Sequence, residues 1–246
     1  MATTHKVIPI KPITAWSYSR YSTYKQCPLK LKLSAIDKIQ EKKNDAMIRG
    51  ATIHDLAEAY IKGKMTKLPD ELKLFKAEFA MLRKQYKKSI NGMVVEDNWS
   101  FTKAWTETAW NDWVGCWVRI KLDCAHHLDE DTMIVTDWKT GKFREEMNED
   151  YVEQLELYAL AALLLHPHLK AVKPRLGYTD QGLWYPQAGQ EVVFTPADIP
   201  RLKKLWEGRV KAMMNDKIFA PKPNRFCSWC HYRKSNAAAG GGQCKF

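Results

Sequence analysis

The stretch TDWKTGK, residues 136–142, follows the apolar run TMIV at 132–135 and gives the first indication of how the chain folds. Alternate side chains of a strand share a face, so a strand over 132–139 would place Asp137 and Lys139 on the same face. The Thr-Gly pair at 140–141 is typical of a turn that ends such a strand. An acid and a base spaced by two residues are also a common surface ion pair, so their meaning depends on the rest of the chain.

Strand-like and helix-like runs surround this stretch in an order that predicts an α/β fold. Apolar residues alternate with charged ones toward the end of a strand predicted over 113–127, and Pro167 ends a helix predicted over 148–166. The segment LDED at 128–131 is expected to be the turn of a hairpin. Because hairpins need antiparallel pairing, we expect a central mixed β-sheet flanked by helices. The other expected elements are helices over 15–33, 49–63, 70–89 and 196–215, and strands over 92–101, 172–179, 182–186 and 190–195.

The predicted hairpin would bring two carboxylates together. Asp123 and Asp137 are equally far from Glu130 in the middle of the turn. An antiparallel pairing centred there places them opposite each other, with Cβ atoms about 5 Å apart. Like charges at that distance repel, and a bound cation would reconcile them. The alternative for Asp123 alone is a turn or cap residue.

His54 is a third group of the kind that binds divalent cations. It lies in the helix predicted over 49–63, on or beside the apolar stripe. Two carboxylates and an imidazole suit Mg²⁺ or Mn²⁺, and such an ion stabilises charge on a phosphoryl group and lowers the pKa of a bound water. Lys139 would then hold or polarise that water. The alternative for His54 alone is a half-buried histidine with a structural role.

Composition places the chain among ordinary globular proteins, with 45% hydrophobic and 27% charged residues. No apolar run approaches the roughly 18 residues of a membrane span, and the N-terminus lacks the apolar segment of a signal peptide. We therefore expect a cytoplasmic protein without a membrane partner, in the host cytoplasm if the short chain is a phage product. Its six cysteines are then thiols or metal ligands, and Cys116 and Cys124, within a predicted strand, are interpreted as small core residues.

The remaining four cysteines form a metal-binding pattern. The motif CSWC presents Cys227 and Cys230 as two thiolates to one metal, and Cys27 and Cys244 would close a tetrahedral or cluster site. Zinc and an iron–sulfur cluster both fit four thiolates. The long gap between residues 230 and 244 leaves His231 as an alternative fourth ligand.

Positive charge is concentrated at the two ends of the chain. The net charge is +11, and residues 1–50 hold ten Lys/Arg against three Asp/Glu while residues 201–246 hold eleven against two. Solubility alone could explain one basic segment, but two of them in an aromatic-rich chain favour a polyanion such as nucleic acid. The aromatic residues expected to stack on bases are Trp16, Tyr18, Tyr21 and Trp229.

Four motifs together resemble the PD-(D/E)XK nuclease superfamily, in the branch of the RecB-type nuclease domains and the CRISPR-associated RecB-like exonucleases. They are GATIHDLAEAY (50–60), IKLDCAHH (120–127), VTDWKTGK (135–142) and QLELYAL (154–160), in the family's order. The resemblance covers residues 17 to 246 and implies a restriction-endonuclease-like core. It also implies one nuclease domain over 1–246, with a core at about 45–216 and a cluster-binding subdomain formed by 15–35 and 217–246.

The resemblance also implies roles for individual residues. The residues matching the family's His, Asp and Asp/Glu, here His54, Asp123 and Asp137, would bind the metal, and Lys139 would assist the attacking water. The backbone carbonyl of Trp138 would complete the metal shell. Gln154 and Tyr158, which share a helix face, would lie beside the active site and touch DNA or support the lysine. Glu96 is interpreted either as a further group of the metal site or as a plain surface residue.

For the cysteines, the resemblance implies a 4Fe–4S cluster that joins the N- and C-terminal segments, with Zn²⁺ as the alternative. The expected function is a metal-dependent DNA exonuclease that acts on single strands or duplex ends in recombination, repair or DNA processing. Two alternatives remain at this point. One is a non-catalytic nucleic-acid-binding protein with a structural four-cysteine metal site, and the other is the nuclease subunit of a CRISPR-type or recombination complex with a protein partner.

Overall fold

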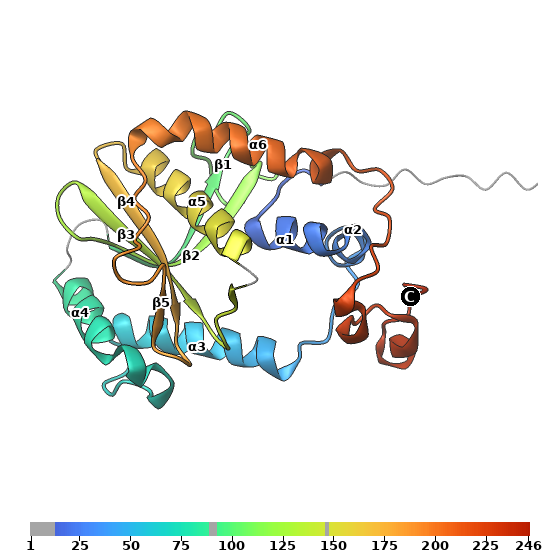
Figure 1. Cartoon of the computed structure of the whole chain (residues 1–246), viewed down its shortest axis with the longest axis horizontal. Helices are drawn as coiled ribbons and strands as arrows, with labels where there is room; N and C mark the ends of the chain where they lie inside the picture. Colours follow the sequence, from blue (N-terminus) through green and yellow to red (C-terminus); the bar gives the residue numbers. More distant parts are fainter. Residues whose placement is uncertain (1–12, 89–92, 146–147) are drawn as a thin grey trace, which may run out of the picture. The chain divides into compact units, whose positions relative to one another are not determined.

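A computed structural model describes residues 13–88, 93–145 and 148–246 (Figure 1). The chain divides into two compact units. One contains the described residues up to Lys42 together with Glu207–Phe246, and the other contains Lys43–Trp206. The division falls within helix α6 (Ile199–Asn215).

The larger unit is built on one five-stranded mixed sheet. The strands lie in the order β1-β2-β3-β4-β5, and β3 pairs with β4 in parallel while the other neighbours are antiparallel. A mixed sheet follows from the chain order: short turns join β2 to β3 and β4 to β5, a longer loop joins β1 to β2, and a helix joins the parallel pair β3 and β4. The strands are β1 (Val94–Phe101), β2 (Val118–His127), β3 (Thr132–Lys139), β4 (Ala171–Tyr178) and β5 (Leu183–Tyr185).

The hairpin between β2 and β3 has the predicted register. Cys124 pairs with Thr136 and Ala125 with Val135, which is the pairing centred on Glu130. The backbone N–H of Leu128 donates to the carbonyl of Thr132 at 2.9 Å, so the turn begins where LDED begins. This register carries Asp123 and Asp137 to facing positions.

Helices cover both faces of the sheet (Figure 1). Helices α3 (Asp45–Ile61) and α4 (Lys76–Lys87), with a 3₁₀ segment between them, pack on the face that carries Trp138. Phe79 of α4 stacks on the Trp138 indole, with ring centroids 4.6 Å apart. Helix α5 (Asn148–Leu165) lies against the other face, where Leu155 packs on Leu176 of β4. The expected α/β class with a central mixed sheet flanked by helices is confirmed.

The smaller unit ties an N-terminal segment to the C-terminal segment. Helix α1 (Tyr18–Gln26) is capped by Ser17, and helix α2 (Pro28–Leu31) begins at a proline, so the predicted helix over 15–33 is interrupted at Cys27. Asn224 Nδ2 donates to the Gln26 carbonyl at 2.9 Å, and the Tyr232 hydroxyl donates to the Ile39 carbonyl at 2.8 Å. Residues almost 200 positions apart therefore share hydrogen bonds.

Two sequence expectations about strands are wrong. The strand predicted over 113–127 begins only at Val118, since residues 102–117 form a structured loop. The segment predicted as a strand over 190–195 contributes an isolated bridge between Phe194 and Val172. The expected end of a helix at 89 and the start of a strand at 92 lie outside the described residues. Within the described residues, no helix is long and apolar enough to cross a membrane.

Candidate active site

The predicted site residues come from five elements of the larger unit. Helix α3 carries His54, β2 carries Asp123, β3 carries Asp137 and Lys139, and α5 carries Gln154 and Tyr158. Glu96 of β1 joins them. Each helix presents its polar residue beside buried apolar neighbours, such as Ile53 and Ala57 in α3, so core packing fixes where the polar group lies.

His54, Glu96 and Asp123 form a compact group of possible metal ligands. His54 Nδ1 lies 3.0 Å from Asp123 Oδ1 and 3.7 Å from Glu96 Oε1, and one ligand atom of each residue lies within 4.8 Å of the others. Burial by itself would lower the pKa of His54, but the neighbouring carboxylates of Asp123 and Glu96 outweigh it and raise this pKa to about 10. The imidazole therefore carries a proton that a metal ion would displace.

Each carboxylate oxygen of Asp123 has a partner in the site. Its Oδ2 accepts a 2.7 Å hydrogen bond from the backbone N–H of Trp138, while its Oδ1 faces His54. Burial and the nearby charge of Asp137 raise the pKa of Asp123, and the contact with His54 partly opposes that rise. The observed contact of Trp138 is thus made by its N–H group, and a role for its carbonyl remains a prediction.

Two side chains of helix α5 donate hydrogen bonds to Asp137. Its Oδ1 accepts hydrogen bonds from the Tyr158 hydroxyl at 2.5 Å and from Gln154 Nε2 at 3.1 Å. Burial and the charge of Asp137 raise the pKa of Tyr158, so the phenol stays protonated and donates. Gln154 and Tyr158 were expected to touch DNA or support Lys139, and in the structure they orient Asp137.

The second oxygen of Asp137 is buried and has spare lone pairs beside its ion-pair partner Lys139. Oδ2 is buried and accepts no hydrogen bond from the described residues, although Lys139 Nζ lies 2.6 Å away as an ion-pair partner. A buried carboxylate oxygen with spare lone pairs, next to a second buried carboxylate and an imidazole, is a donor set that a hard divalent cation satisfies. The residues of the site therefore fit Mg²⁺ or Mn²⁺.

The sequence left the role of Glu96 open. The pairings Val95 with Cys124 and Asp97 with Leu122 place Glu96 across from Asp123. Glu96 has a φ of 53°, in the left-handed region that costs a residue with a side chain about 1–2 kcal/mol. Burial would raise the pKa of Glu96, but its contacts with His54 and Lys121 lower it. The register of the β1–β2 hairpin is the signal that could have predicted its place.

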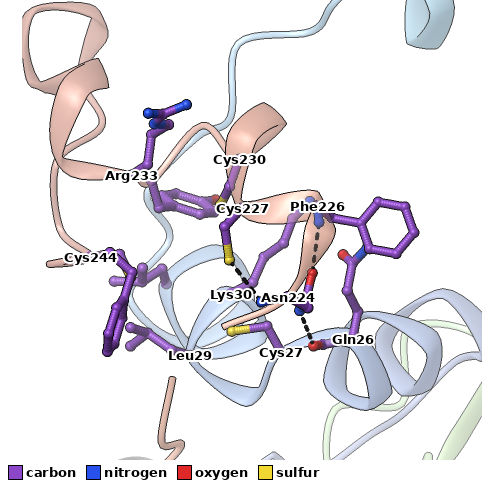
Figure 2. Close-up of a pocket in the computed structure, with 13 residues that line it drawn as sticks. Gln26, Cys27, Leu29, Lys30, Asn224, Phe226, Cys227, Cys230, Arg233 and Cys244 are labelled. Atoms are coloured by element: carbon purple, nitrogen blue, oxygen red, sulfur yellow. Dashed lines mark hydrogen bonds between the residues drawn. The ribbon is translucent and has the colours of Figure 1, made fainter. Parts of the chain in front are cut away.

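The four metal-type cysteines meet in a separate pocket of the smaller unit (Figure 2). Cys27, Cys227, Cys230 and Cys244 all line it, and His231 does not. Backbone N–H groups donate to two of the sulfur atoms: that of Lys222 to Cys27 at 3.4 Å and that of Asn224 to Cys227 at 3.3 Å. Such bonds stabilise thiolates. The structure thus gathers the four cysteines that the sequence grouped.

Two of the aromatic residues expected to stack on bases are not exposed to solvent. Trp16 and Tyr21 are buried. Trp229 is 85% exposed, and Tyr18 is half-buried. Cys116 and Cys124 are buried as expected.

A carboxylate pair on a β-hairpin, with a lysine two residues after the second acid, defines a class of metal-dependent hydrolases. The model of the PD-(D/E)XK nuclease superfamily matches residues 15–235. The chain belongs to this superfamily, which implies a hydrolytic nuclease that uses divalent metal ions and has DNA as its substrate. None of the curated proteins is significantly similar to it.

Two solved structures match the chain over much of its length. One is the crystal structure, at 2.19 Å resolution, of a protein from Eubacterium rectale described as a "putative exonuclease", with 10% identity, a TM-score of 0.48, and coverage of 89% of this chain and 88% of that one. The other is the crystal structure of SSO0001, with 12% identity, a TM-score of 0.31, and coverage of 75% of this chain and 95% of that one.

Proposed function

We propose that the protein is an exonuclease that hydrolyses phosphodiester bonds of DNA with Mg²⁺ or Mn²⁺, on single strands or duplex ends. The observation that carries this proposal is the convergence of His54, Glu96 and Asp123 within 4.8 Å, next to the Asp137–Lys139 pair. A non-catalytic binding protein has no need of this arrangement. The preference for ends rests on the resemblance to RecB-like exonucleases.

Each residue has a part in this reaction. His54, Glu96, Asp123 and Asp137 would hold the cation. A bound Mg²⁺ or Mn²⁺ supplies charge stabilisation at the phosphoryl group and an acidified water. Lys139, anchored on Asp137 at 2.6 Å, positions the attacking water and offsets the negative charge that develops on the phosphate.

Removing the lysine tests the catalytic part of the proposal. Lys139→Ala is expected to lower the rate of digestion of labelled single- and double-stranded DNA by at least about 100-fold, the contribution of a well-placed proton-transfer or charge-stabilising group. The exposed Lys142, three residues later, provides the matched control, and Lys142→Ala should digest DNA at close to the normal rate. Equal digestion by all three proteins, with Mg²⁺ or Mn²⁺, would contradict the role of Lys139.

The four cysteines are proposed to bind a 4Fe–4S cluster that stabilises the smaller unit. Support comes from their common pocket, from the N–H groups directed at two sulfur atoms, and from the resemblance to the cluster-binding branch. Four thiolates from both ends of the chain would then fix the two segments to each other. Zn²⁺ is the rival occupant, because the same ligands suit it.

The colour of the protein separates the two metals. Anaerobically purified protein is expected to be brown, and Cys227→Ser should lose both the colour and the iron. Cys116→Ser is a control, since this buried cysteine lies in the other unit. Colourless protein with one zinc per chain would show that the cysteines bind zinc and not a cluster. The assignment of the active site would be unaffected.

A further inference from the structure

A structured loop presents two tryptophans on the surface of the larger unit. Residues 102–117 join β1 to β2. At the apex of the loop the Trp113 side chain is 78% exposed and its neighbour Val114 is 98% exposed, while Trp110 is 38% exposed. Two further tryptophans of this loop, Trp105 and Trp117, are buried and pack edge to face with ring centroids 5.3 Å apart. The loop is therefore anchored in the core and exposes an aromatic side chain at its tip.

Hydrogen bonds lock the apex. The Asp112 carboxylate accepts bonds from the Thr108 hydroxyl at 2.8 Å, from the Val114 N–H at 3.1 Å and from the Gly115 N–H at 2.8 Å. A Cβ at Gly115 would lie 2.3 Å from Asp112 Oδ2, so this close turn requires glycine. Trp113 is consequently displayed on a preorganised turn, which lowers the entropy lost when a ligand stacks on it.

The guanidinium group of Arg119 lies beside the indole rings of Trp110 and Trp113. The Arg119 guanidinium carbon lies 5.0 Å from the ring centroid of Trp113 and 5.8 Å from that of Trp110. Its Nε donates to the Trp110 carbonyl at 3.0 Å, which leaves the two terminal nitrogens for other acceptors. An aromatic face beside a guanidinium matches a nucleotide, because the indole stacks on a base and the guanidinium faces phosphate.

The loop and the candidate active site lie on one hairpin. Strand β2 begins at Val118, directly after the loop, and reaches Asp123 five residues later, which is about 17 Å at roughly 3.4 Å per residue. At the 3.4 Å rise of a stacked strand, this separation corresponds to about five nucleotides. A strand whose end enters the active site could therefore reach the loop.

We propose that Trp113, supported by Trp110 and Arg119, is a stacking platform for the single-stranded segment of the substrate that lies outside the active site. This inference rests on the proposed nuclease function for its substrate, but its binding step needs no catalysis. An apolar docking surface for a protein or a membrane would use Val114 as much as Trp113. The paired cation and the shared hairpin favour nucleic acid.

Binding without catalysis tests the platform directly. Fluorescence anisotropy with a labelled 20-nucleotide oligo(dT) in EDTA should show about tenfold weaker binding for Trp113→Ala, the cost of losing one stacked base. Trp113→Phe, which keeps an aromatic face, and Val114→Ala, which has none to lose, should each stay within about twofold of the unchanged protein. Hydrolysis of bis(p-nitrophenyl) phosphate, which is too small to reach the loop, should be unaffected by Trp113→Ala.

Each other outcome has a distinct meaning. Unchanged oligo(dT) binding by Trp113→Ala would overturn the platform. Equal losses in Trp113→Ala and Val114→Ala would overturn it in favour of apolar docking, and a dimer in sedimentation that Trp113→Ala dissociates would overturn it in favour of self-association. Absence of DNA digestion by the unchanged protein with Mg²⁺ or Mn²⁺, with the tenfold binding loss still present, would reject the nuclease proposal and keep the platform.

Discussion

A single carboxylate, Asp137, organises the candidate active site. One oxygen accepts from Tyr158 and Gln154, and the other faces Lys139. The two donors from α5 fix the plane of the carboxylate before any cation arrives, so its second oxygen is already directed. Preorganisation of this kind lowers the free-energy cost of assembling a charged site.

His126 gives a pH dependence of stability. This histidine is 2% exposed, and burial, together with the positive charges of Arg175 and His127, lowers its pKa from 6.5 to about 4. The unfolded chain therefore binds a proton between pH 6.5 and 4 that the folded chain excludes. Stability from this group is complete above pH 6.5 and is lost as the pH falls, by about 3 kcal/mol at most.

Urea unfolding of the wild type and of His126→Gln at pH 7.5 and pH 4.5 measures this effect. The wild type should lose more unfolding free energy than the variant on acidification, because glutamine does not titrate. His168→Gln, at an exposed histidine, serves as the control and should keep the wild-type loss. Identical losses in all three proteins would show that His126 does not contribute.

For single residues, the sequence predicted which side chains of the candidate active site lie together, but not every contact that they make. Hairpin symmetry around Glu130 was sufficient to pair Asp123 with Asp137. The β1–β2 register could have placed Glu96 across from Asp123, but its left-handed φ is a backbone feature that no side-chain pattern signals. The error for Trp16 and Tyr21 has another cause, since an aromatic residue near basic ones is equally suited to a core and to a binding surface.

The parallel strands β3 and β4 require a glycine at position 177, because the ring of Trp138 lies close to its backbone. Gly177 of β4 pairs with Trp138 of β3, and a Cβ on it would lie 2.6 Å from the Trp138 ring and 2.9 Å from the Trp184 ring. Both rings are held by Phe75, so neither can retreat freely. Gly177→Ala is expected to destabilise the protein by about 1–3 kcal/mol through overpacking.

Thermal or urea unfolding checks this value. Gly208→Ala in α6 is the matched control, because nothing lies within 4 Å of its Cβ position. That substitution should leave the stability unchanged or raise it by up to about 1 kcal/mol, since alanine favours a helix. A Gly177→Ala protein as stable as the wild type would mean that the sheet can move apart there.

The bounds of strands with a clear apolar pattern were predicted well, whereas the bounds of strands without one were not. Strand β3 has the bounds expected from its apolar run, 132–139. The start of β2 was placed five residues too early because residues 113–117, WVGCW, have a strand-like composition but form a loop held by Asp112 and Gly115. Local hydrogen bonds to a single aspartate decided the structure, and apolar composition does not reveal them.

For the whole molecule, the positive charge belongs to one unit. In the sequence, residues 1–42 and 207–246 hold sixteen Lys/Arg against four Asp/Glu, whereas the net charge of the entire chain is +11. The other unit is therefore close to neutral. Attraction for DNA phosphates should come chiefly from the smaller unit.

Salt titration of DNA binding tests this distribution. Affinity for oligo(dT) in EDTA is expected to fall by at least about 100-fold between about 50 and 200 mM salt, because bound phosphates release counterions. Lys217→Glu with Lys234→Glu, both exposed in the smaller unit, should make the dependence shallower. Lys73→Glu with Lys76→Glu, equally exposed in the larger unit, is the control and should retain the slope. A slope near zero in the wild type would argue against phosphate contacts.

The hydrogen bond between Asn224 and Gln26 has a consequence for biosynthesis. Helices α1 and α2 leave the ribosome long before their partners at residues 222–232 exist, so this unit closes only after residue 232 has been translated. A product of premature termination would expose an unfinished surface with a lone thiol at Cys27. Such an incomplete chain is a substrate for quality-control proteases.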